Sequence, residues 1–453
     1  MTALLSDIDQ LRAGFSGDVL SPADEPYESA RMVHNGAIDR RPGLITRCRS
    51  TADVVDAVTF AREHGMEVSV RGGGHNVAGR AVTDGGLMID LSPMRGIHVD
   101  ARTRTVGAQG GVTWREYNRA AHVHGLATTG GTVSTTGIAG LTLGGGVGWL
   151  MGTQGLAIDN LLSVEVVTAD GTVRTVGEHD EPDLFWAMRG AGANFGVATW
   201  FEYRAHPQAT VVGGLTAYPL EDAEDVLAVY RDAMVNASDE LSAFYVLTHA
   251  PDGSGTKLVV VVTCHLGDQA TADRELAPLR SAGTVLMDTV GPMPYPAVNM
   301  LLDDGFPRGA RNYWKSGFVE AVDGDLAPRM VDAFRRSPSI MSGVLLEHYH
   351  GAATRVPTTA TAYPHREPGF NMVIAGEWLA PEDDDANRRW VRSLFGALAS
   401  HLGDASYVNY LDADDLQRTR AAYGPNWDRL VELKQRWDPD NAFHHNHNIA
   451  PGR

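Results

Sequence analysis

The sequence predicts an α+β protein with more than one domain. Its 453 residues are too many for one compact hydrophobic core. Strand-like and helix-like segments alternate along the chain, and glycine is concentrated in two loops of the first 200 residues. Residues 210–400 contain no comparable loop. We therefore expect one part built around the glycine-rich loops and a separate α+β part after it.

The composition is that of a globular protein with a high glycine content. Hydrophobic residues make up 43% of the chain and charged residues 21%, which are ordinary values. Glycine accounts for 50 residues, more than the usual share of about 7%. The net charge of −18 argues against nucleic-acid or anionic membrane partners, because both need basic patches. An anionic cofactor is compatible with this charge, since main-chain N–H groups can bind phosphate.

The cysteines and the N-terminal segment exclude other classes. Cys48 and Cys264 are too far apart in sequence for the spacing of a zinc site or a redox pair, so we expect buried thiols and no metal site. Residues 1–15 have neither a basic start nor an apolar run before a cleavage site. No segment approaches the ~18–20 apolar residues that span a bilayer. We expect a cytoplasmic protein.

The first glycine loop follows a predicted helix and strand. Residues 50–64 are expected to form a helix, with Ser50 as its cap and Asp53 completing a capping box. Residues 66–70 alternate like a half-buried strand and lead into Arg71-Gly-Gly-Gly-His-Asn76. A strand that leads into three glycines predicts a close approach of the main chain to another group.

The remaining elements follow from periodicity and turn residues. In the first part we expect strands at 86–91, 96–100 and 105–109, a helix at 113–124, a glycine-rich tract at 130–155 and a hairpin at 162–176. Later we expect strands at 257–263, 370–375 and 407–412, and helices at 220–237, 268–281, 325–336, 381–402 and 426–437.

The two glycine tracts are the strongest functional signal. Consecutive glycines let main-chain N–H groups turn inward as an anion-binding nest, and two such loops suit the paired phosphates of a dinucleotide. The alternative is that these glycines only form tight turns. That would explain an isolated Gly-Gly, but it does not explain two long glycine-rich tracts. Neither residues 144–149 nor residues 190–196 match the G-x-G-x-x-G fingerprint, so a nicotinamide dehydrogenase is disfavoured.

Several long motifs resemble one family of flavoproteins. Residues 68–79 resemble the first phosphate loop of the vanillyl-alcohol oxidase/p-cresol methylhydroxylase family, and the most similar branch is the berberine bridge enzyme-like oxidases. The resemblance continues, in the same order, through residues 135–148, 184–197 and 423–449. In all it covers about residues 25–205 and 405–450.

The resemblance implies a PCMH-type FAD-binding domain made from both ends of the chain. Residues 1–208 and 404–453 would form this domain, and residues 209–403 would form an inserted substrate domain. The insert would be an antiparallel sheet with helices over one face. The implied partners are a small-molecule substrate and O2, and the chain would be a monomer or a homodimer.

The resemblance also implies that FAD is bonded covalently to His75. A neutral imidazole is a competent nucleophile towards an electrophilic flavin tautomer. Some relatives have a second bond, from a cysteine at the position of Val133, so a single bond is implied here. Leu141 stands where many relatives have a histidine, which leaves that position without a catalytic role.

The other residues that the resemblance assigns to the cofactor lie in both glycine loops and near the C-terminus. They are Val70, Arg71, Gly72, Gly73, Gly74, Asn76, Thr135, Gly137, Ala139, Gly140, Leu141, Gly144, Gly145, Gly146, Val147, Gly148, Val197, Asn409, Asn446 and Asn448.

The proposed catalytic residues are two tyrosines. Tyr407-x-Asn-Tyr410 matches the tyrosine-bearing strand of many relatives, in which the second tyrosine often acts as the base. A phenol has a pKa near 10, so a base role needs positive charge or hydrogen bonds nearby. On a regular strand the two tyrosines would face opposite sides, and we expect Tyr410 to be the catalytic one. Aromatic packing is the alternative. Further candidates for the substrate cavity are Tyr313, Trp314, Lys315, His348 and Tyr349.

The predicted reaction is oxidation of a small molecule by hydride transfer. A C–H bond next to an OH or NH group would give its hydride to flavin N5, Tyr410 would take the heteroatom proton, and O2 would reoxidise the flavin. A flavin dehydrogenase with another electron acceptor and a non-catalytic binding protein are the alternatives. The substrate stays open among sugars, secondary-metabolite alcohols and cyclic amines.

Overall fold

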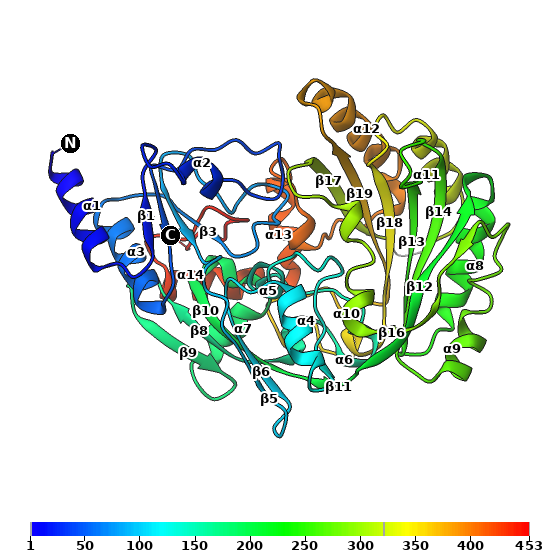
Figure 1. The fold of residues 1–453 in the computed structure, drawn as a ribbon, viewed down its shortest axis with the longest axis horizontal. Coiled ribbons are helices and arrows are strands. Elements are labelled where there is room, and N and C mark those ends of the chain that lie inside the picture. Colours follow the sequence, from blue (N-terminus) through cyan, green and yellow to red (C-terminus); the bar gives the residue numbers. More distant parts are fainter. Residues whose placement is uncertain (1, 320–321, 453) are drawn as a thin grey trace.

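The fold has two halves, and the C-terminal helices belong to the same half as the first 200 residues. The computed structural model describes residues 2–319 and 322–452. In Figure 1 α13 (Thr419–Tyr423) and α14 (Trp427–Trp437) lie among the elements of the N-terminal half, while a large sheet occupies the other half. Helix α14 packs against α7 (Pro182–Ala191), which joins the two ends of the chain.

A four-stranded sheet carries the first glycine loop. Its strand order is β1 (Asp18–Leu20), β2 (Leu44–Arg47), β4 (Leu87–Asp90) and β3 (Val68–Arg71), and the last three strands are parallel. Helix α3 (Thr51–Glu63) covers this sheet with an apolar face, and the predicted capping box of Ser50 and Asp53 is confirmed. The glycine loop begins where β3 ends, so the sheet fixes its starting point.

A five-stranded antiparallel sheet supports the second glycine tract. Its order is β5 (Ile97–Asp100), β6 (Thr105–Gln109), β10 (Val197–Arg204), β8 (Leu161–Val167) and β9 (Val173–Gly177). The predicted hairpin of β8 and β9 is confirmed. Helices α4 (Trp114–His122), α5 (Ile138–Leu143) and α7 share its hydrophobic core, so α5 is anchored in the middle of the glycine tract.

The large sheet is antiparallel throughout and lies between residues 210 and 378. Its strands are β12 (Thr210–Pro219), β13 (Leu241–His249), β14 (Lys257–His265), β15 (Met287–Asp288), β16 (Gly291–Pro294), β17 (Arg311–Val319), β18 (Gly343–Tyr349) and β19 (Gly369–Trp378). Helices α8 (Ala223–Val235), α11 (Leu326–Arg335) and α12 (Asp384–Ala397) pack on one face, as predicted.

The other face of this sheet meets the glycine-rich half. Trp149 stacks on Phe244 of β13 with 4.2 Å between ring centroids, within a core that includes residues of β14, β18 and β19. Because both faces are covered, polar side chains on the inner face of the sheet are enclosed between the two halves.

Short helices and strands complete the fold. They are α1 (Thr2–Gly14), α2 (Tyr27–Ala30), β7 (Leu126–Ala127), α6 (Met151–Gln154), β11 (His206–Pro207), α9 (Gln269–Leu276) and α10 (Tyr295–Val298). Helix α9 is shorter than the predicted 268–281, because Pro278 has no N–H with which to continue the helical hydrogen bonds. Within the described residues no helix is long and apolar enough to cross a membrane.

The predicted strand at residues 407–412 is wrong. Residues Val408–Tyr410 form a 3₁₀ turn, in which the N–H of Tyr410 donates to the carbonyl oxygen of Tyr407 at 3.0 Å. Alternation therefore does not apply, and the two tyrosine rings lie together at 4.9 Å between centroids, edge to face.

Candidate functional site

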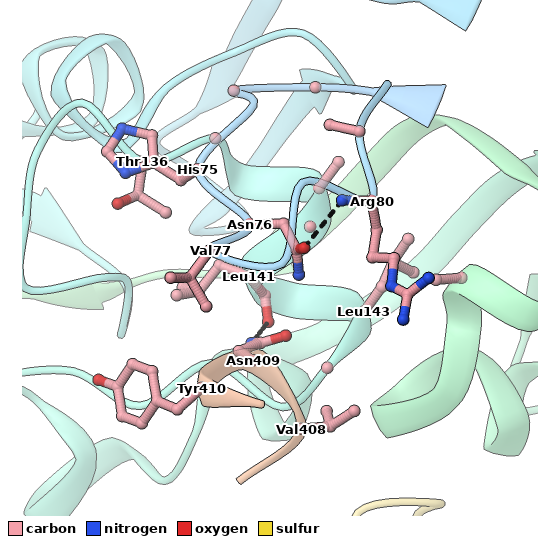
Figure 2. Close-up of a pocket in the computed structure, with 18 of the residues that line it drawn as sticks. His75, Asn76, Val77, Arg80, Thr136, Leu141, Leu143, Val408, Asn409 and Tyr410 are labelled. Atoms are coloured by element: carbon pink, nitrogen blue, oxygen red, sulfur yellow. Dashed lines mark hydrogen bonds between the residues drawn. The ribbon is translucent and has the colours of Figure 1, made fainter. Parts of the chain in front are cut away.

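One large cavity lies where the glycine loops, the C-terminal segment and the large sheet meet. It encloses about 2010 Å³ of empty space, including its open mouth. Figure 2 shows three separate segments around it, within residues 75–80, 136–143 and 408–410. Strands β17, β18 and β19 supply the opposite wall. A cavity with walls from such distant parts of the chain is typical of a ligand site between domains.

The two glycine loops touch each other main chain to main chain. A Cβ atom on Gly73 would lie 2.6 Å from Cα of Gly137, and a Cβ on Gly137 would lie 2.7 Å from Cα of Gly73. Gly74 has a φ of +73°, which disfavours residues with a side chain. The loops therefore need glycine both for their mutual contact and for the turn that leads to His75.

Most of the residues predicted to hold the cofactor line this cavity. They are Val70, Gly72, Gly73, Gly74, His75, Asn76, Gly137, Ala139, Gly140, Leu141, Gly144, Val147, Asn409 and Asn446. The cavity wall does not include Arg71, Thr135, Gly145, Gly146, Gly148, Val197 or Asn448.

Several residues outside the wall have a structural explanation. The Arg71 guanidinium forms a two-point ion pair with Asp90, at 2.9 and 2.5 Å, and also donates to two main-chain carbonyls. Gly145 and Gly146 have φ values of +133° and +88°, so they bend the chain behind the cavity. Because these glycines have no side chain, Tyr363 and Tyr407 can lie close to Gly145, and Ala157 can lie close to Gly146.

His75 is held as a neutral imidazole at the cavity wall. Its Nε2 lies 3.0 Å from Oγ1 of Thr135, and its ring stacks on His34 with 3.9 Å between centroids. Burial, together with the neighbouring His34, lowers the pKa of His75 well below its ordinary value. Burial also lowers the pKa of His34 to about 4. A neutral ring is the form that can act as a nucleophile.

Unsatisfied polar atoms at the cavity fit a large polar ligand such as FAD. Within the described residues, Oδ1 of Asn446 and both ring nitrogens of His447 are buried without a hydrogen-bond partner, as is Nε of Arg80. Buried polar groups are costly unless they are satisfied, so these atoms point to a bound group that supplies the partners. The sequence reasoning missed His447 and Arg80, although His447 lies inside the matched C-terminal motif.

Tyr407 is buried and fixed to the second glycine loop. Its hydroxyl oxygen accepts hydrogen bonds from the N–H of Gly146 at 2.9 Å, the N–H of Val147 at 3.4 Å and Nδ2 of Asn409 at 2.7 Å. Burial raises the pKa of Tyr407 to about 12, although the three hydrogen bonds act to lower it. The Tyr407 ring does not line the cavity. Its hydroxyl instead holds the second glycine loop in place through the bonds to Gly146 and Val147.

Tyr410 lines the cavity and forms a pair with Glu347 of β18. Its hydroxyl donates to Oε1 of Glu347 at 2.9 Å, and Nδ2 of Asn371 donates to Oε2 at 2.8 Å. Burial raises the pKa of Glu347 to about 7, although both hydrogen bonds favour the carboxylate. Burial and the adjacent Glu347 raise the pKa of Tyr410 well above its ordinary value. The pair can accept and pass on a proton near neutral pH.

The sequence reasoning also missed Glu347. Its one signal is a charged residue that follows three apolar residues of a strand, residues 344–346, and that shares a face with Leu345. A buried polar residue on a sheet face is informative, but the sequence alone does not indicate which cavity the face meets.

The wall around Tyr410 and Glu347 is mainly apolar. It consists of Leu302, Phe306, Trp314, Leu345 and Val373, with Asn312 as a further polar residue. Of the five residues predicted to line a substrate cavity, the structure brings only Trp314 to the wall of this one. Tyr313 and Lys315 bind Asp414 instead, at 2.7 and 2.6 Å, and His348 stacks on His350 behind the sheet.

The fold and the cavity define a class of flavoprotein, and comparisons with known proteins agree. Residues 42–177 match the family described as the FAD binding domain, and residues 406–450 match the family described as berberine and berberine like. The chain is 32% identical over 455 residues to (R)-6-hydroxynicotine oxidase of Paenarthrobacter nicotinovorans, covering 96% of this chain and 97% of the relative. The chain therefore belongs to the berberine bridge enzyme-like FAD-linked oxidoreductases, and it is an oxidoreductase that uses FAD.

A further relative and two solved structures are similar to the chain over nearly its whole length. An FAD-linked oxidoreductase of Dictyostelium discoideum is 29% identical over 450 residues, covering 98% of this chain and 97% of the relative. The crystal structure of 6-hydroxy-D-nicotine oxidase from Arthrobacter nicotinovorans superposes with a TM-score of 0.88 at 29% identity, covering 97% of this chain and 99% of the other. A chitooligosaccharide oxidase has a TM-score of 0.86 at 21% identity, with both chains fully covered, and shares the fold.

Proposed function

We propose that this protein is an oxidase that holds FAD through a single covalent bond to His75 and oxidises a C–OH or C–NH group of an apolar small molecule. The observation that carries the proposal is the hydrogen-bonded pair of Tyr410 and Glu347. This pair lies in the same cavity as His75 and the glycine loops. The cavity thus combines a cofactor cradle with a proton acceptor at an apolar wall.

The glycine loops and the C-terminal segment would hold the cofactor. Main-chain groups of residues 72–76 and 137–144 suit the diphosphate, because these loops are built from closely packed glycines. Asn446, His447 and Arg80 offer buried polar atoms without protein partners. When bound, FAD would supply the redox chemistry by accepting a hydride at N5.

Tyr410 would take the proton of the substrate heteroatom, and Glu347 would take the phenolic proton. The phenol already donates to Oε1 of Glu347, so a proton that arrives at the tyrosine oxygen displaces one towards the carboxylate. With a pKa of about 7, Glu347 is ionised for a useful fraction of the time near neutral pH. Tyr407 is a weaker candidate, because three N–H donors occupy its hydroxyl.

A single bond to the flavin is supported by the cysteines. Both Cys48 and Cys264 are buried outside the cavity wall, and burial raises the pKa of each thiol. A protonated, enclosed thiol is inert as a nucleophile. Val133 lines the cavity at the position where some relatives have a cysteine.

The apolar wall favours a cyclic amine or a hydrophobic alcohol over a sugar. A sugar needs many hydrogen-bond partners, and the wall near Tyr410 offers mainly Leu302, Phe306, Trp314, Leu345 and Val373. The name of the relative (R)-6-hydroxynicotine oxidase refers to a substrate with a cyclic amine. The carboxylate of Glu347 would also favour a substrate with a basic nitrogen.

The decisive experiment combines a substrate screen with exposure to air. Purified protein is mixed anaerobically with cyclic amines, apolar alcohols and sugars, and bleaching of the flavin absorbance identifies the substrate. We expect bleaching by an amine or alcohol and, on aeration, recovery of the colour with release of hydrogen peroxide. Reduced flavin that persists in air but is reoxidised by a quinone would favour the dehydrogenase alternative. A colourless protein would indicate a non-catalytic one.

A further inference from the structure

We propose that Arg80 is the cation that neutralises the diphosphate of FAD. Arg80 follows directly on the glycine motif of residues 68–79, and its side chain lines the main cavity. Its role rests on the cofactor site of the proposed function but not on the covalent bond, because the diphosphate and the flavin ring are different parts of FAD.

The wall of the main cavity contains few permanent charges. Among the described residues that line it, Arg80 is the only arginine or lysine, and Glu347 is the only carboxylate. The wall also contains four histidines, which are His34, His75, His445 and His447. Burial lowers the pKa of each of these four, so they are neutral at pH 7. Of the described wall residues, Arg80 therefore supplies the one positive charge.

The guanidinium of Arg80 has no partner within residues 2–319 and 322–452. The hydrogen bond of Arg80 in this part of the chain comes from its main-chain N–H, and Nε of the side chain is buried without a partner. Burial, together with the neighbouring Arg40, lowers the pKa of Arg80. An enclosed charge without a partner is costly, so the site favours an anion that supplies one.

Two carboxylates attract Arg80 without contacting it, and both are bound elsewhere. Glu67 and Asp412 act to raise the pKa of Arg80, but neither forms an ion pair with it. Glu67 accepts a hydrogen bond from Thr83 and lies 3.4 Å from Nδ1 of His445. Asp412 accepts hydrogen bonds from two main-chain N–H groups, at 3.0 and 2.6 Å. The protein thus leaves the charge of Arg80 available to a ligand.

The turn before Arg80 fixes the place of its side chain. The N–H of Arg80 donates to Oδ1 of Asn76 at 3.1 Å, and the N–H of Gly79 donates to the carbonyl oxygen of Asn76 at 3.0 Å. Figure 2 shows Arg80 and His75 on opposite sides of Asn76. The cation and the histidine proposed to hold the flavin ring therefore lie apart along the same loop.

The diphosphate is the part of FAD that suits a guanidinium at this position. It carries the negative charge of the cofactor, whereas the flavin ring, the ribityl chain and the adenosine are neutral. A guanidinium can donate two parallel hydrogen bonds to phosphate oxygens. The N–H groups of the glycine loops supply only partial positive charges, so Arg80 adds the full charge that these loops lack.

The first test measures reversible binding in the His75→Ala background, in which the proposed covalent bond cannot form. FAD, ADP and riboflavin are titrated into flavin-free protein by calorimetry, and ADP is also titrated into the flavin-free wild type. We expect Arg80→Gln to weaken the binding of FAD and ADP by about 10–100-fold, as for the loss of a charged hydrogen-bond donor. Riboflavin has no phosphate, so its affinity should not change.

Two further variants control for the loss of charge. Arg80→Lys keeps the positive charge and should keep most of the affinity for FAD. Arg389→Gln removes an exposed charge from helix α12 and should leave the affinity for FAD unchanged. Wild-type affinity for FAD and ADP in Arg80→Gln, or an equal loss of affinity for riboflavin, would overturn the proposal.

The unfolding temperature without FAD separates this role from a purely structural one. Because an unpaired enclosed cation destabilises the flavin-free protein, Arg80→Gln should unfold at the same temperature as its parent or at a higher one. Added FAD should raise the unfolding temperature of the parent more than that of Arg80→Gln. A flavin-free Arg80→Gln protein that unfolds at a clearly lower temperature would show that the guanidinium supports the fold, and would overturn the proposal.

The outcomes for Arg80 and for the proposed function can be told apart. Acid-soluble flavin in the wild type would overturn the covalent bond and leave the role of Arg80 intact. Flavin-free wild type that binds neither FAD nor ADP would overturn the cofactor site and the role of Arg80 together.

Discussion

At the scale of single residues, the proposed chemistry depends on the ionisation of Glu347. Burial raises its pKa to about 7, so the folded state holds this proton more tightly than the unfolded chain, whose glutamate pKa is near 4.5. Stability from this group is therefore fully present below that unfolded value and is lost as the pH rises through about 7. A carboxylate that costs stability at neutral pH is typical of a functional site.

The first prediction concerns Tyr410 and Glu347. We expect Tyr410→Phe and Glu347→Gln each to slow anaerobic flavin reduction by ~10²–10⁴, because both interrupt the proposed proton transfer. In the wild type the rate should rise with pH through about 7, as Glu347 ionises, and Glu347→Gln should lack this rise. Stopped-flow absorbance over a pH series measures both effects.

The matched control for this prediction is Tyr407→Phe. It removes the hydroxyl from a buried ring whose centroid lies 4.9 Å from that of Tyr410, and it leaves the Glu347 contact in place. We expect a smaller loss of rate and an unchanged pH profile. If Tyr410→Phe reduces its flavin at nearly the wild-type rate, Tyr410 is not the base.

Residues differ in how far the sequence alone predicts them. His75 lies in a long motif, so the sequence indicated its place at the cavity, whereas its contacts with Thr135 and His34 were not predicted. Glu347 and His447 were missed, because each becomes informative only when a distant part of the chain encloses it. Burial and pairing are tertiary properties, and local patterns do not contain them.

At the scale of elements, the two glycine loops are in close main-chain contact at Gly73 and Gly137. Strand β3 delivers the first loop against the second, and the predicted strand and capping box were confirmed because their signals are local. The predicted strand at 407–412 was wrong: the segment forms a 3₁₀ turn, beside which the Tyr407 hydroxyl accepts hydrogen bonds from the N–H groups of Gly146 and Val147. Those donors are some 260 residues away in sequence, beyond the reach of a periodicity argument.

The second prediction compares two glycine substitutions. In Gly73→Ala the new Cβ would lie 2.6 Å from Cα of Gly137, so one loop must move. We expect a loss of about 1–3 kcal/mol in the free energy of unfolding, together with reduced FAD content. Urea denaturation and flavin absorbance per protein measure the two effects.

The control is Gly396→Ala in helix α12. A Cβ there meets no atom within 4 Å, so we expect a gain of about 0.5–1 kcal/mol from helix propensity and unchanged FAD content. A Gly73→Ala protein with full stability and full FAD content would show that the loops do not need their close contact.

At the scale of the whole molecule, the cavity exists only because distant parts of the chain meet. The first 200 residues supply the glycine loops and His75, the large sheet and the segment before β17 supply Glu347 and the apolar wall, and the C-terminal segment supplies Tyr410 and His447. The motifs predicted the family and its α+β fold. The shape of the substrate wall was not predicted, since it depends on which face of β17, β18 and β19 meets the loops.

The most direct measurement of the central claim is the mass of the peptide that contains His75. Protein is precipitated with acid, digested and analysed by mass spectrometry. We predict a yellow precipitate and a His75 peptide that carries the mass of FAD, whereas His75→Ala should release its flavin or contain none. Free flavin in the wild-type supernatant, with an unmodified His75 peptide, would contradict the account.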